Sequence, residues 1–347
     1  MKDFTNQQAI AKLDPQDTLG STELLPKQLE KVWGEVQKLD LSLDADRVSN
    51  IVFCGMGASI YGALVLKAIL GEKFAFPVEI ISDYHLPLFV DSSSLVVLTS
   101  YSGSTEEVLS CAQEAKAKKA QMLVLTKGGK LAQFAKENNV PAYIFDGELN
   151  PSGVPRLGNG YTILGLMGLL HKTGVVSLDV RLIDDAINMA HQIQESVKSK
   201  ALKDANRFLG KVPIVFAAEH LSGNAQILRN QFNETSKTFC SFYLIPDLNH
   251  HLMEGLQFPK LTNLQFLVLN SPCYSKRIKK RVALTIDVVR QNNHTIDSFN
   301  TSGKSAYHDA IESMIYSGFL TLFLGLLYDQ NPAVNPWVDY FKKKLSE

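Results

Sequence analysis

The sequence has few cysteines, no excess of charge of either sign and no apolar run of membrane-spanning length. Of its 347 residues, four are cysteines, and 35 basic residues balance 35 acidic ones. A formal net charge of zero argues against a dedicated nucleic-acid or membrane-surface binder, which usually carries a basic patch. It leaves a small anionic ligand open, because such a ligand needs only a local site.

The longest apolar run covers about residues 315–328. It is shorter than the roughly 18–20 residues needed to span a bilayer, so a buried core helix is the better interpretation. The first residues, MKDFT, open no apolar segment of the kind that begins a signal peptide. We therefore expect a cytoplasmic protein without a membrane partner.

The cysteines are widely separated and none forms a CxxC pair. They are Cys54, Cys111, Cys240 and Cys273. Such gaps are atypical of zinc sites and disulfide frameworks, so we expect reduced, buried thiols.

Short β-branched runs alternate with longer helical stretches, which predicts α/β architecture with parallel sheets flanked by helices. The predicted strands are residues 50–54, 77–82, 95–100, 121–126, 142–145, 211–217, 239–244, 264–269 and 294–299. The predicted helices are residues 59–70, 104–119, 130–138, 156–172, 180–199, 222–236, 275–291 and 335–345.

The strand–helix pattern runs through twice, which predicts two α/β domains with a boundary near residues 172–178. We assign residues 46–175 to the first domain and 176–347, including a C-terminal helix, to the second. Residues 1–45 are amphipathic and are expected to be helical, with Thr22 as an N-cap.

The strongest local signal is the run SYSGSTEE at residues 100–107, after a predicted strand and at the start of a predicted helix. Hydroxyls and free helix N–H groups together form an uncharged cradle for a phosphate. A plain helix cap is the alternative, because serine and threonine are favoured there. Four serine and threonine hydroxyls within six positions favour anion binding.

A glycine-rich loop, GMGAS at residues 55–59, follows the first strand. It begins like a dinucleotide-binding fingerprint, but its sixth position is Ile60, and Asp83 comes late for the acidic residue that such a site needs. The glycines more plausibly let the backbone approach a ligand, with Ser59 facing the same crevice. No nicotinamide cofactor is expected.

Farther along lie Arg156, the run NETSK at residues 233–237 and the run PDLNH at residues 246–250. Together with the two loops, this order resembles the bifunctional phosphoglucose/phosphomannose isomerase family over nearly the whole chain. The resemblance implies two flavodoxin-like SIS (sugar isomerase) domains, a small-molecule sugar-phosphate substrate, no cofactor and a homodimer.

The resemblance also implies roles for particular residues. Glu234 matches the general base that moves a proton between C1 and C2, Arg156 the arginine beside those carbons, and His250 the ring-opening residue, which arrives from the partner subunit. The residues that match the family's phosphate binders are Ser59, Ser100, Ser102 and Thr105. On the C-terminal segment, Lys342 matches the family's active-site lysine, and Asn335 falls where the family has a polar residue near the substrate.

Aldose–ketose isomerisation needs residues of these types, whether or not the chain resembles the family. Moving a proton between neighbouring carbons needs a carboxylate base, and the enediolate intermediate needs a fixed cation such as a guanidinium. Ring opening suits histidine, whose pKa is ordinarily near neutrality. Taken singly, Glu234 is better interpreted as an exposed helix residue and His250 as an ordinary loop histidine, and only their combination with Arg156 and the hydroxyl loop favours a catalytic role. A metal site at His250, His251 and Glu254 is disfavoured, because adjacent histidines point apart and no HExxH pattern is present.

Three positions depart from the family pattern. His251 stands where the family has asparagine, the segment before Arg156 reads PSGVP, and Asn335 is not the expected residue. The preferred hexose phosphate is therefore left open.

Three functions remain. The first is isomerisation of glucose 6-phosphate or mannose 6-phosphate to fructose 6-phosphate. The others are a non-catalytic SIS module that senses a sugar phosphate, and another SIS enzyme acting on amino-sugar phosphates. A sensor would usually carry a DNA-binding domain, for which 45 N-terminal residues are too few.

Overall fold

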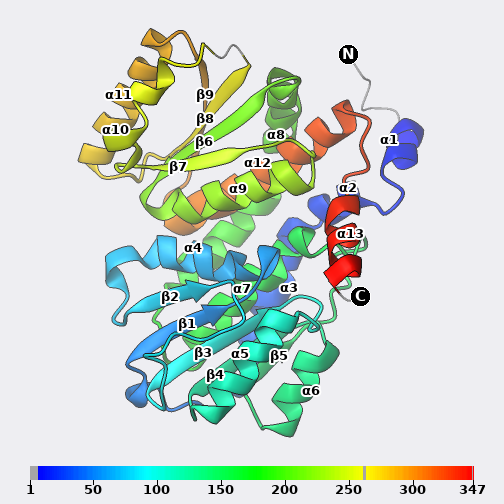
Figure 1. The fold of residues 1–347 in the computed structure, drawn as a ribbon, viewed down its shortest axis with the longest axis vertical. Helices are drawn as coiled ribbons and strands as arrows, with labels where there is room; N and C mark the ends of the chain where they lie inside the picture. Colours follow the sequence, from blue (N-terminus) through cyan, green and yellow to red (C-terminus); the bar gives the residue numbers. More distant parts are fainter. Residues whose placement is uncertain (1–6, 261–262, 346) are drawn as a thin grey trace.

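The protein consists of two parallel sheets stacked one above the other, with helices between them and on their outer faces (Figure 1). This computed structural model describes residues 7–260, 263–345 and 347. The first sheet has the strand order β2-β1-β3-β4-β5 and the second β7-β6-β8-β9, and all pairings are parallel. The predicted α/β fold class is confirmed.

The strands are β1 (Asn50–Cys54), β2 (Val78–Ile81), β3 (Ser94–Ser100), β4 (Gln121–Thr126), β5 (Ala142–Ile144), β6 (Val212–Ala218), β7 (Ser241–Ile245), β8 (Leu264–Asn270) and β9 (Thr295–Asn300). The helices are α1 (Gln7–Leu13), α2 (Thr18–Glu23), α3 (Leu25–Val36), α4 (Tyr61–Leu70), α5 (Glu106–Ala117), α6 (Gly129–Glu137), α7 (Asn159–Lys172), α8 (Val180–Phe208), α9 (Ser222–Glu234), α10 (Leu248–His251), α11 (Lys276–Gln291), α12 (Ala306–Leu327) and α13 (Pro336–Leu345).

The inner strands of the first sheet, β1, β3 and β4, are largely buried on both faces, as their continuous apolar sequences predict. In β1, Ile51 and Phe53 join the large core shared with the second sheet, whereas Val52 and Cys54 face the smaller core formed with α5 and α6. Because successive side chains point to opposite faces, one strand contributes to both cores.

The two halves share one hydrophobic core. Helices α4, α7, α9 and α12 lie between the sheets, and α8 packs along α12. The buried side chains of these helices form a single cluster with residues of both sheets. Helix α12 is long and apolar enough to cross a membrane, but the whole of its apolar window is buried inside the protein. It is the core helix that the apolar run near its C-terminal end predicted. The domain limits at residues 45, 175 and 347 stay a prediction, and the expected boundary falls in the turn between α7 and α8.

Two local predictions are wrong. Thr22 is not an N-cap: it lies inside α2, where its hydroxyl donates to the main-chain oxygen of Thr18 (2.8 Å), and Asp17 caps that helix instead by accepting from the N–H of Gly20 (3.0 Å). All four cysteines are free, but Cys273 is exposed, because it lies in the loop after β8 and not in a buried element.

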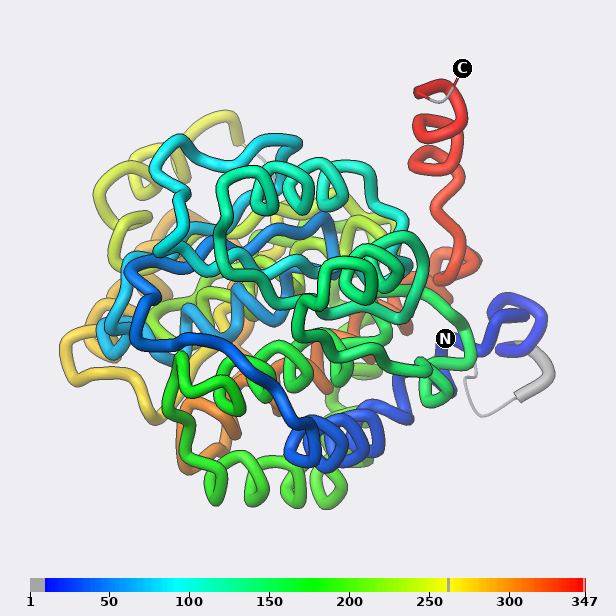
Figure 2. Tube along the Cα trace, turned by 90° about the horizontal axis from the view of Figure 1, so that it is seen from below, coloured from blue at the N-terminus to red at the C-terminus, as the bar shows by residue number. Residues whose placement is uncertain are grey.

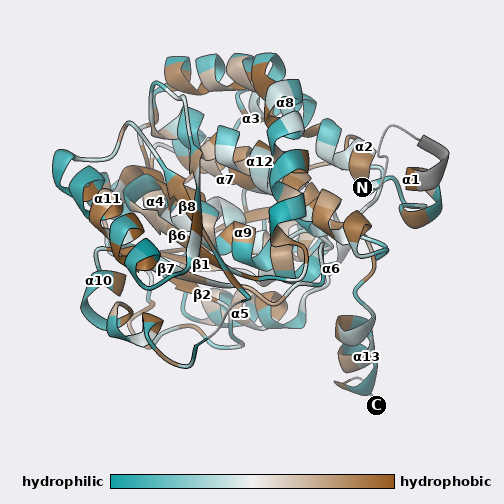
Figure 3. Cartoon of the chain, turned by 90° about the horizontal axis from the view of Figure 1, so that it is seen from above, coloured by the Kyte–Doolittle hydropathy of each residue, from teal (hydrophilic) through white to brown (hydrophobic). Residues whose placement is uncertain are grey.

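Helix α13 stands away from the rest of the molecule (Figures 2 and 3). None of its described residues is buried, including the large side chains of Trp337 and Phe341. The C-terminal helix is therefore present as predicted, but its described side chains are not packed into the core of their own chain.

Close packing of α9 on α4 holds the two halves together, and Gly223 makes it possible. A Cβ at this position would lie 2.5 Å from the main-chain oxygen of Leu64. Gly223→Ala should lower the free energy of unfolding by about 1–3 kcal/mol, measured by urea denaturation. Gly34→Ala in α3, where a Cβ meets nothing within 4 Å, is the control and should instead stabilise by about 0.5–1 kcal/mol. Equal stability of Gly223→Ala and the wild type would contradict this packing.

Candidate active site

The predicted phosphate loop forms a compact turn in which hydroxyls contact one another. The hydroxyl of Ser100, the last residue of β3, lies 2.7 Å from that of Thr105 and accepts from the N–H of Gly103 at 3.0 Å. The hydroxyl of Ser102, which is exposed, accepts from the N–H of Ser104 at 3.3 Å. The loop thus gathers its hydroxyls at the carboxyl end of β3.

Only glycine fits at position 103 of this loop. Its φ is +71°, and a Cβ there would lie 1.7 Å from the main-chain oxygen of Gly128. The loop is also joined to the first glycine-rich turn, η2 (Gly57–Ile60), because the hydroxyl of Ser59 accepts from the N–H of Tyr101 at 3.0 Å. This junction lies between β1 and β3, where the strand order reverses and ligands of such sheets usually bind.

The start of α5 remains available to an anion. Thr105 is its N-cap residue, but it makes no side-chain capping bond because its hydroxyl faces Ser100. The first N–H groups of a helix have no partner within the helix, and they carry its positive dipole end. The loop and the helix start therefore suit a phosphate.

A second cluster centres on Arg156, which belongs to the short helix η4 (Pro155–Leu157). Its Nε donates to the hydroxyl of Thr235 (2.9 Å), and its Nη2 donates to the main-chain oxygens of Ala333 (3.2 Å) and Pro332. Its Nη1 lies 3.4 Å from Oε2 of Glu234. The Arg156 side chain is only 3% exposed and that of Glu234 is 34% exposed. A fixed cation therefore lies beside a carboxylate that solvent or substrate can reach.

The geometry follows from where α9 ends. Glu234 is the last residue of α9, so its main-chain oxygen has no partner in the helix and accepts from Nη2 of Arg156 at 3.4 Å. Burial lowers the pKa of Arg156 below its ordinary value, and the charge of Glu234 opposes that shift. A guanidinium nevertheless stays protonated in proteins, so the cation is permanent.

Asn335 lies at the same pair. Its Nδ2 is 3.4 Å from Oε2 of Glu234, and with the amide turned over its oxygen would accept from Nη1 of Arg156 at 3.0 Å. The glycine-rich turn η2 packs against η4, so Ser59 and Arg156 lie on neighbouring turns. One chain thus brings together, in a continuous series of contacts, Ser59, Ser100, Ser102, Thr105, Arg156, Glu234 and Asn335.

Two predicted site residues lie elsewhere. His250 is exposed on α10, at the far side of the second sheet from the C-terminal end of α9 (Figure 1). Lys342 is exposed on the projecting helix α13. Within one chain, the structure does not bring either side chain to Glu234.

Two contributors, Thr235 and Lys237, were not predicted from the sequence. Thr235 supplies the hydroxyl that orients Arg156, and Lys237 donates to the main-chain oxygen of Glu234 at 2.6 Å. Both belong to the NETSK run, so the motif itself was visible in the sequence. Its sequence does not show that α9 ends at Glu234, and only this helix end turns the two side chains back toward Arg156 and the main chain of Glu234.

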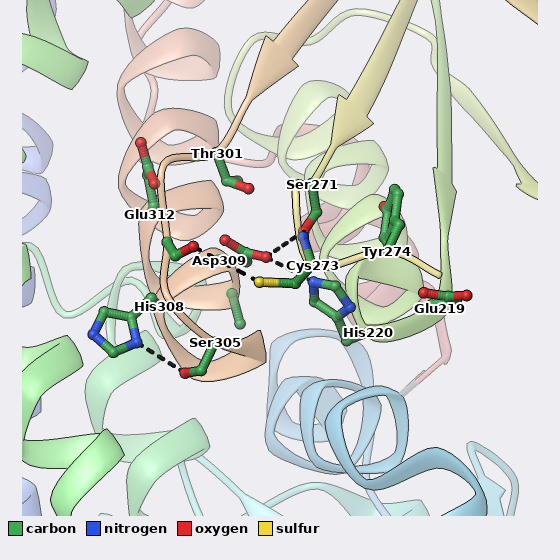
Figure 4. Close-up of polar contacts among 12 residues, drawn as sticks. Glu219, His220, Ser271, Cys273, Tyr274, Thr301, Ser305, His308, Asp309 and Glu312 are labelled. Carbon is green, nitrogen blue, oxygen red and sulfur yellow. Dashed lines mark hydrogen bonds and ion pairs between the residues drawn. The ribbon is translucent and has the colours of Figure 1, made fainter. Parts of the chain in front are cut away.

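The corresponding edge of the second sheet carries a polar network of its own (Figure 4). His220 follows β6 and its Nε2 lies 2.8 Å from Oδ2 of Asp309, which also accepts from the hydroxyl of Ser271 after β8. Burial would raise the pKa of Asp309, but hydrogen bonds from His220, Ser271 and Thr301 outweigh it and lower that pKa. At this edge the protein's own carboxylate accepts the hydrogen bonds that an anion would take.

Comparisons with known proteins agree with the two-sheet arrangement. The SIS domain matches residues 46–148, and the bacterial phospho-glucose isomerase C-terminal SIS domain matches residues 197–345. A bifunctional phosphoglucose/phosphomannose isomerase of Caldicellulosiruptor bescii is 30% identical over 338 residues, which cover 93% of this chain and 97% of that protein. A D-glucosamine-6-phosphate 4-epimerase of Sulfolobus acidocaldarius is 30% identical over 229 residues, 64% of this chain and 70% of that protein.

Among solved structures, a hypothetical protein from Thermus thermophilus superposes with a TM-score of 0.71, at 19% identity, over 98% of this chain and 94% of that one. Two parallel sheets with a hydroxyl loop at the first switch point define an SIS-type α/β protein. Within that class, the chain belongs to the bifunctional phosphoglucose/phosphomannose isomerase family and is an isomerase.

The network at Asp309 makes a testable contribution to stability. Because the folded-state pKa of Asp309 is lowered, its ionised form stabilises the fold above the unfolded-state pKa, and this stabilisation is lost as pH falls. Asp309→Asn should lower the free energy of unfolding by about 3 kcal/mol at pH 7. The difference from the wild type should shrink below about pH 4, where the unfolded carboxyl protonates.

Denaturant unfolding at several pH values measures this difference, with Asp46→Asn, an exposed carboxylate, as the control. A penalty for Asp309→Asn that stays constant down to the acid end of the series would contradict the ionised assignment.

Proposed function

We propose that the chain interconverts aldose and ketose 6-phosphates, with glucose 6-phosphate, and also mannose 6-phosphate, converted to fructose 6-phosphate. The observation that carries the proposal is the pair of a buried Arg156 and a half-exposed Glu234, 3.4 Å apart. Such a pair suits a reaction in which a carboxylate moves a proton and a cation faces the resulting negative charge.

In this proposal the phosphate group binds the hydroxyl loop and the start of α5. The residues that bind it are Ser59, Ser100, Ser102 and Thr105. The cradle has no charged side chain among these residues, so it holds the phosphate by hydrogen bonds and by the helix dipole. The reacting end of the sugar then extends toward the turn η4.

Glu234 acts as the base on the open-chain sugar. Its carboxylate removes the proton from C2 of the aldose, and the C–H electron pair forms the C1–C2 double bond of a cis-enediolate while the C1 carbonyl oxygen becomes negative. The O2 hydroxyl loses its proton to O1, the C2 carbonyl forms, and protonated Glu234 returns a proton to C1. Atoms and charge balance without a metal or nicotinamide.

Arg156 stabilises the enediolate. Its Nε and Nη2 are engaged by Thr235, Pro332 and Ala333, which hold the guanidinium plane in place. Its Nη1 faces the two side chains that border the substrate space, with Oε2 of Glu234 at 3.4 Å and, with the amide turned over, the oxygen of Asn335 at 3.0 Å, and we assign Nη1 as the donor to a substrate oxygen there. Because the plane is already fixed, the transition state gains this interaction with little reorganisation.

The remaining roles require a second copy of the chain. We assign ring opening to His250 of the partner subunit, so that the active site lies at the interface of a homodimer, and we assign the exposed Lys342 to a contact with the sugar there. Asn335 needs no second copy, because it lies beside Glu234 of its own chain, and we assign it to a contact with the sugar as well. The position of α10 far from the end of α9 supports an arrangement in trans. The free thiols support a cytoplasmic location.

An amino-sugar phosphate is the second candidate substrate. It is favoured by the 30% identity with the D-glucosamine-6-phosphate 4-epimerase and by His251, which replaces the asparagine of the family pattern. A coupled assay on glucose, mannose and glucosamine 6-phosphates separates the candidates. Tight sugar-phosphate binding without turnover of any of them would favour a non-catalytic module.

Glu234→Gln tests the base. The amide keeps the shape of the side chain but accepts no proton, so kcat should fall about 10²–10⁴-fold. KM should change little, because the hydroxyl loop supplies most of the ground-state binding. Glu137→Gln, on the exposed face of α6, is the control and should retain wild-type rates. A wild-type kcat for Glu234→Gln would contradict the assignment.

Subunit mixing tests the contribution of His250 in trans. A heterodimer of a Glu234→Gln chain and a His250→Ala chain contains one intact site only if His250 acts on the partner's Glu234. Co-refolding equal amounts should therefore restore about a quarter of wild-type activity per chain. Sedimentation of the mixture verifies that dimers form. If dimers form but no activity is recovered, His250 does not act on the Glu234 of the partner chain. It would then act on the site of its own chain or take no part in the reaction.

A further inference from the structure

Lys237 occupies an unusual position just beyond the end of α9. Its φ is +55°, a left-handed conformation that is costly for residues with a side chain and that helices usually give to glycine. The turn folds the side chain back over the helix end. Its Nζ lies 2.6 Å from the main-chain oxygen of Glu234, 3.5 Å from that of Thr235 and 3.4 Å from that of Pro332.

Lys237 shares two of these acceptors with Arg156. The main-chain oxygens of Glu234 and Pro332 each accept from Nη2 of Arg156 as well as from Nζ of Lys237. Two cations therefore bind the same pair of carbonyl groups, one at the negative end of α9 and one in the segment that leads to Asn335. Their shared acceptors tie these two parts of the main chain together.

The environment of Lys237 opposes its charge. Burial and, next, the nearby Arg156 lower the pKa of Lys237 to about 8, although Glu234 favours the charged form. An adjoining cavity of about 350 Å³ also has the titratable Tyr328, just beyond the end of α12, in its lining, and the Tyr328 hydroxyl accepts from the N–H of Gly210 at 2.6 Å. That cavity is lined by Ser236, Lys237, Thr238, Phe239, Tyr328 and Gln330. It gives the ammonium an opening through which its proton exchanges with solvent.

We propose that Lys237 is a positioning residue for the proposed isomerisation: its charged ammonium holds the main chain at Glu234 against residues 332–335 and so sets the carboxylate against Arg156 and Asn335. The inference rests on the proposed function. A charged donor binds a carbonyl about twice as strongly as a neutral one, so loss of the proton loosens this clamp.

The protonation of Lys237 sets how kcat should change with pH. Below pH 8 most Lys237 is charged and the clamp is intact, and as pH rises through about 8 the charge is lost. The wild-type kcat should therefore decline on the alkaline side with an apparent pKa near 8. KM should change little, because Lys237 contacts main-chain carbonyls beside Glu234 and lies outside the hydroxyl loop.

Two substitutions separate charge from titration. Lys237→Met keeps the length of the side chain without its charge, and it should lower kcat about tenfold at pH 7 and abolish the alkaline decline. Lys237→Arg keeps a charge that does not titrate in this range, so it should retain more activity than Lys237→Met, again without the decline. Lys203→Met, an exposed lysine of α8, is the matched control and should behave as the wild type.

Hydrogen–deuterium exchange tests the clamp independently of activity. Peptides covering residues 331–339 should exchange faster in Lys237→Met than in the wild type or Lys203→Met. In the wild type they should also exchange faster above pH 8 than the chemical pH dependence alone predicts. This second comparison needs no variant and stands even if Lys237→Met folds poorly.

The outcomes distinguish the two proposals. If the wild type isomerises hexose phosphates but the alkaline decline persists in Lys237→Met, the positioning role is overturned and the proposed function stands. If no hexose phosphate is isomerised, the proposed function fails, and the exchange measurement alone decides the clamp. Exchange that is the same in all variants and at all pH values, after chemical correction, overturns the clamp.

Discussion

The hydrogen bonds of Arg156 at the end of α9 are the interaction on which the site depends. This guanidinium comes from η4, beside the first sheet, and contacts Thr235 and Glu234 at the end of a helix that flanks the second sheet. It also contacts the carbonyls of Pro332 and Ala333. One buried cation thus connects three segments that are far apart in the sequence. A buried charge with one partner is unfavourable, but here the helix-end carbonyls, a hydroxyl and a carboxylate together compensate its desolvation.

The hydrophobic core that the two halves share holds these three segments in fixed positions relative to one another. Helices α4 and α9 approach closely enough at Gly223 that a single methyl group would not fit, and both helices contribute to a core continuous between the sheets. The turn η2 also packs against η4, so the hydroxyl loop and the cation are neighbours. The second sheet repeats the architecture, yet there Asp309 accepts the hydrogen bonds from Ser271 and His220. Because of this asymmetry, we propose the first sheet as the place where an anionic substrate binds.

The sequence predicted the fold class and most of the residues of the candidate site, because both depend on local patterns. Alternating strands and helices indicated both sheets, and the hydroxyl loop could be recognised as a motif at the end of a strand. Contacts between distant segments could not be predicted. The NETSK run does not show that α9 ends at Glu234, and the sequence of α13 does not show that this helix projects from the molecule with Lys342 exposed. The wrong N-cap at Thr22 arose because Asp17, in a left-handed conformation, starts a short separate helix that the amphipathic pattern merged with the next.

The central claim is that a carboxylate beside a fixed guanidinium moves a proton between neighbouring carbons of a sugar phosphate. The most direct test is to incubate the wild-type protein with glucose 6-phosphate or fructose 6-phosphate in D2O and to locate deuterium in the recovered sugars by NMR. Deuterium is expected at C1 of the ketose and at C2 of the aldose, because a proton held by Glu234 exchanges with solvent before it returns. Isomerised product that contains no deuterium at either carbon would contradict it, since the hydrogen would then have moved directly between the carbons without visiting the carboxylate.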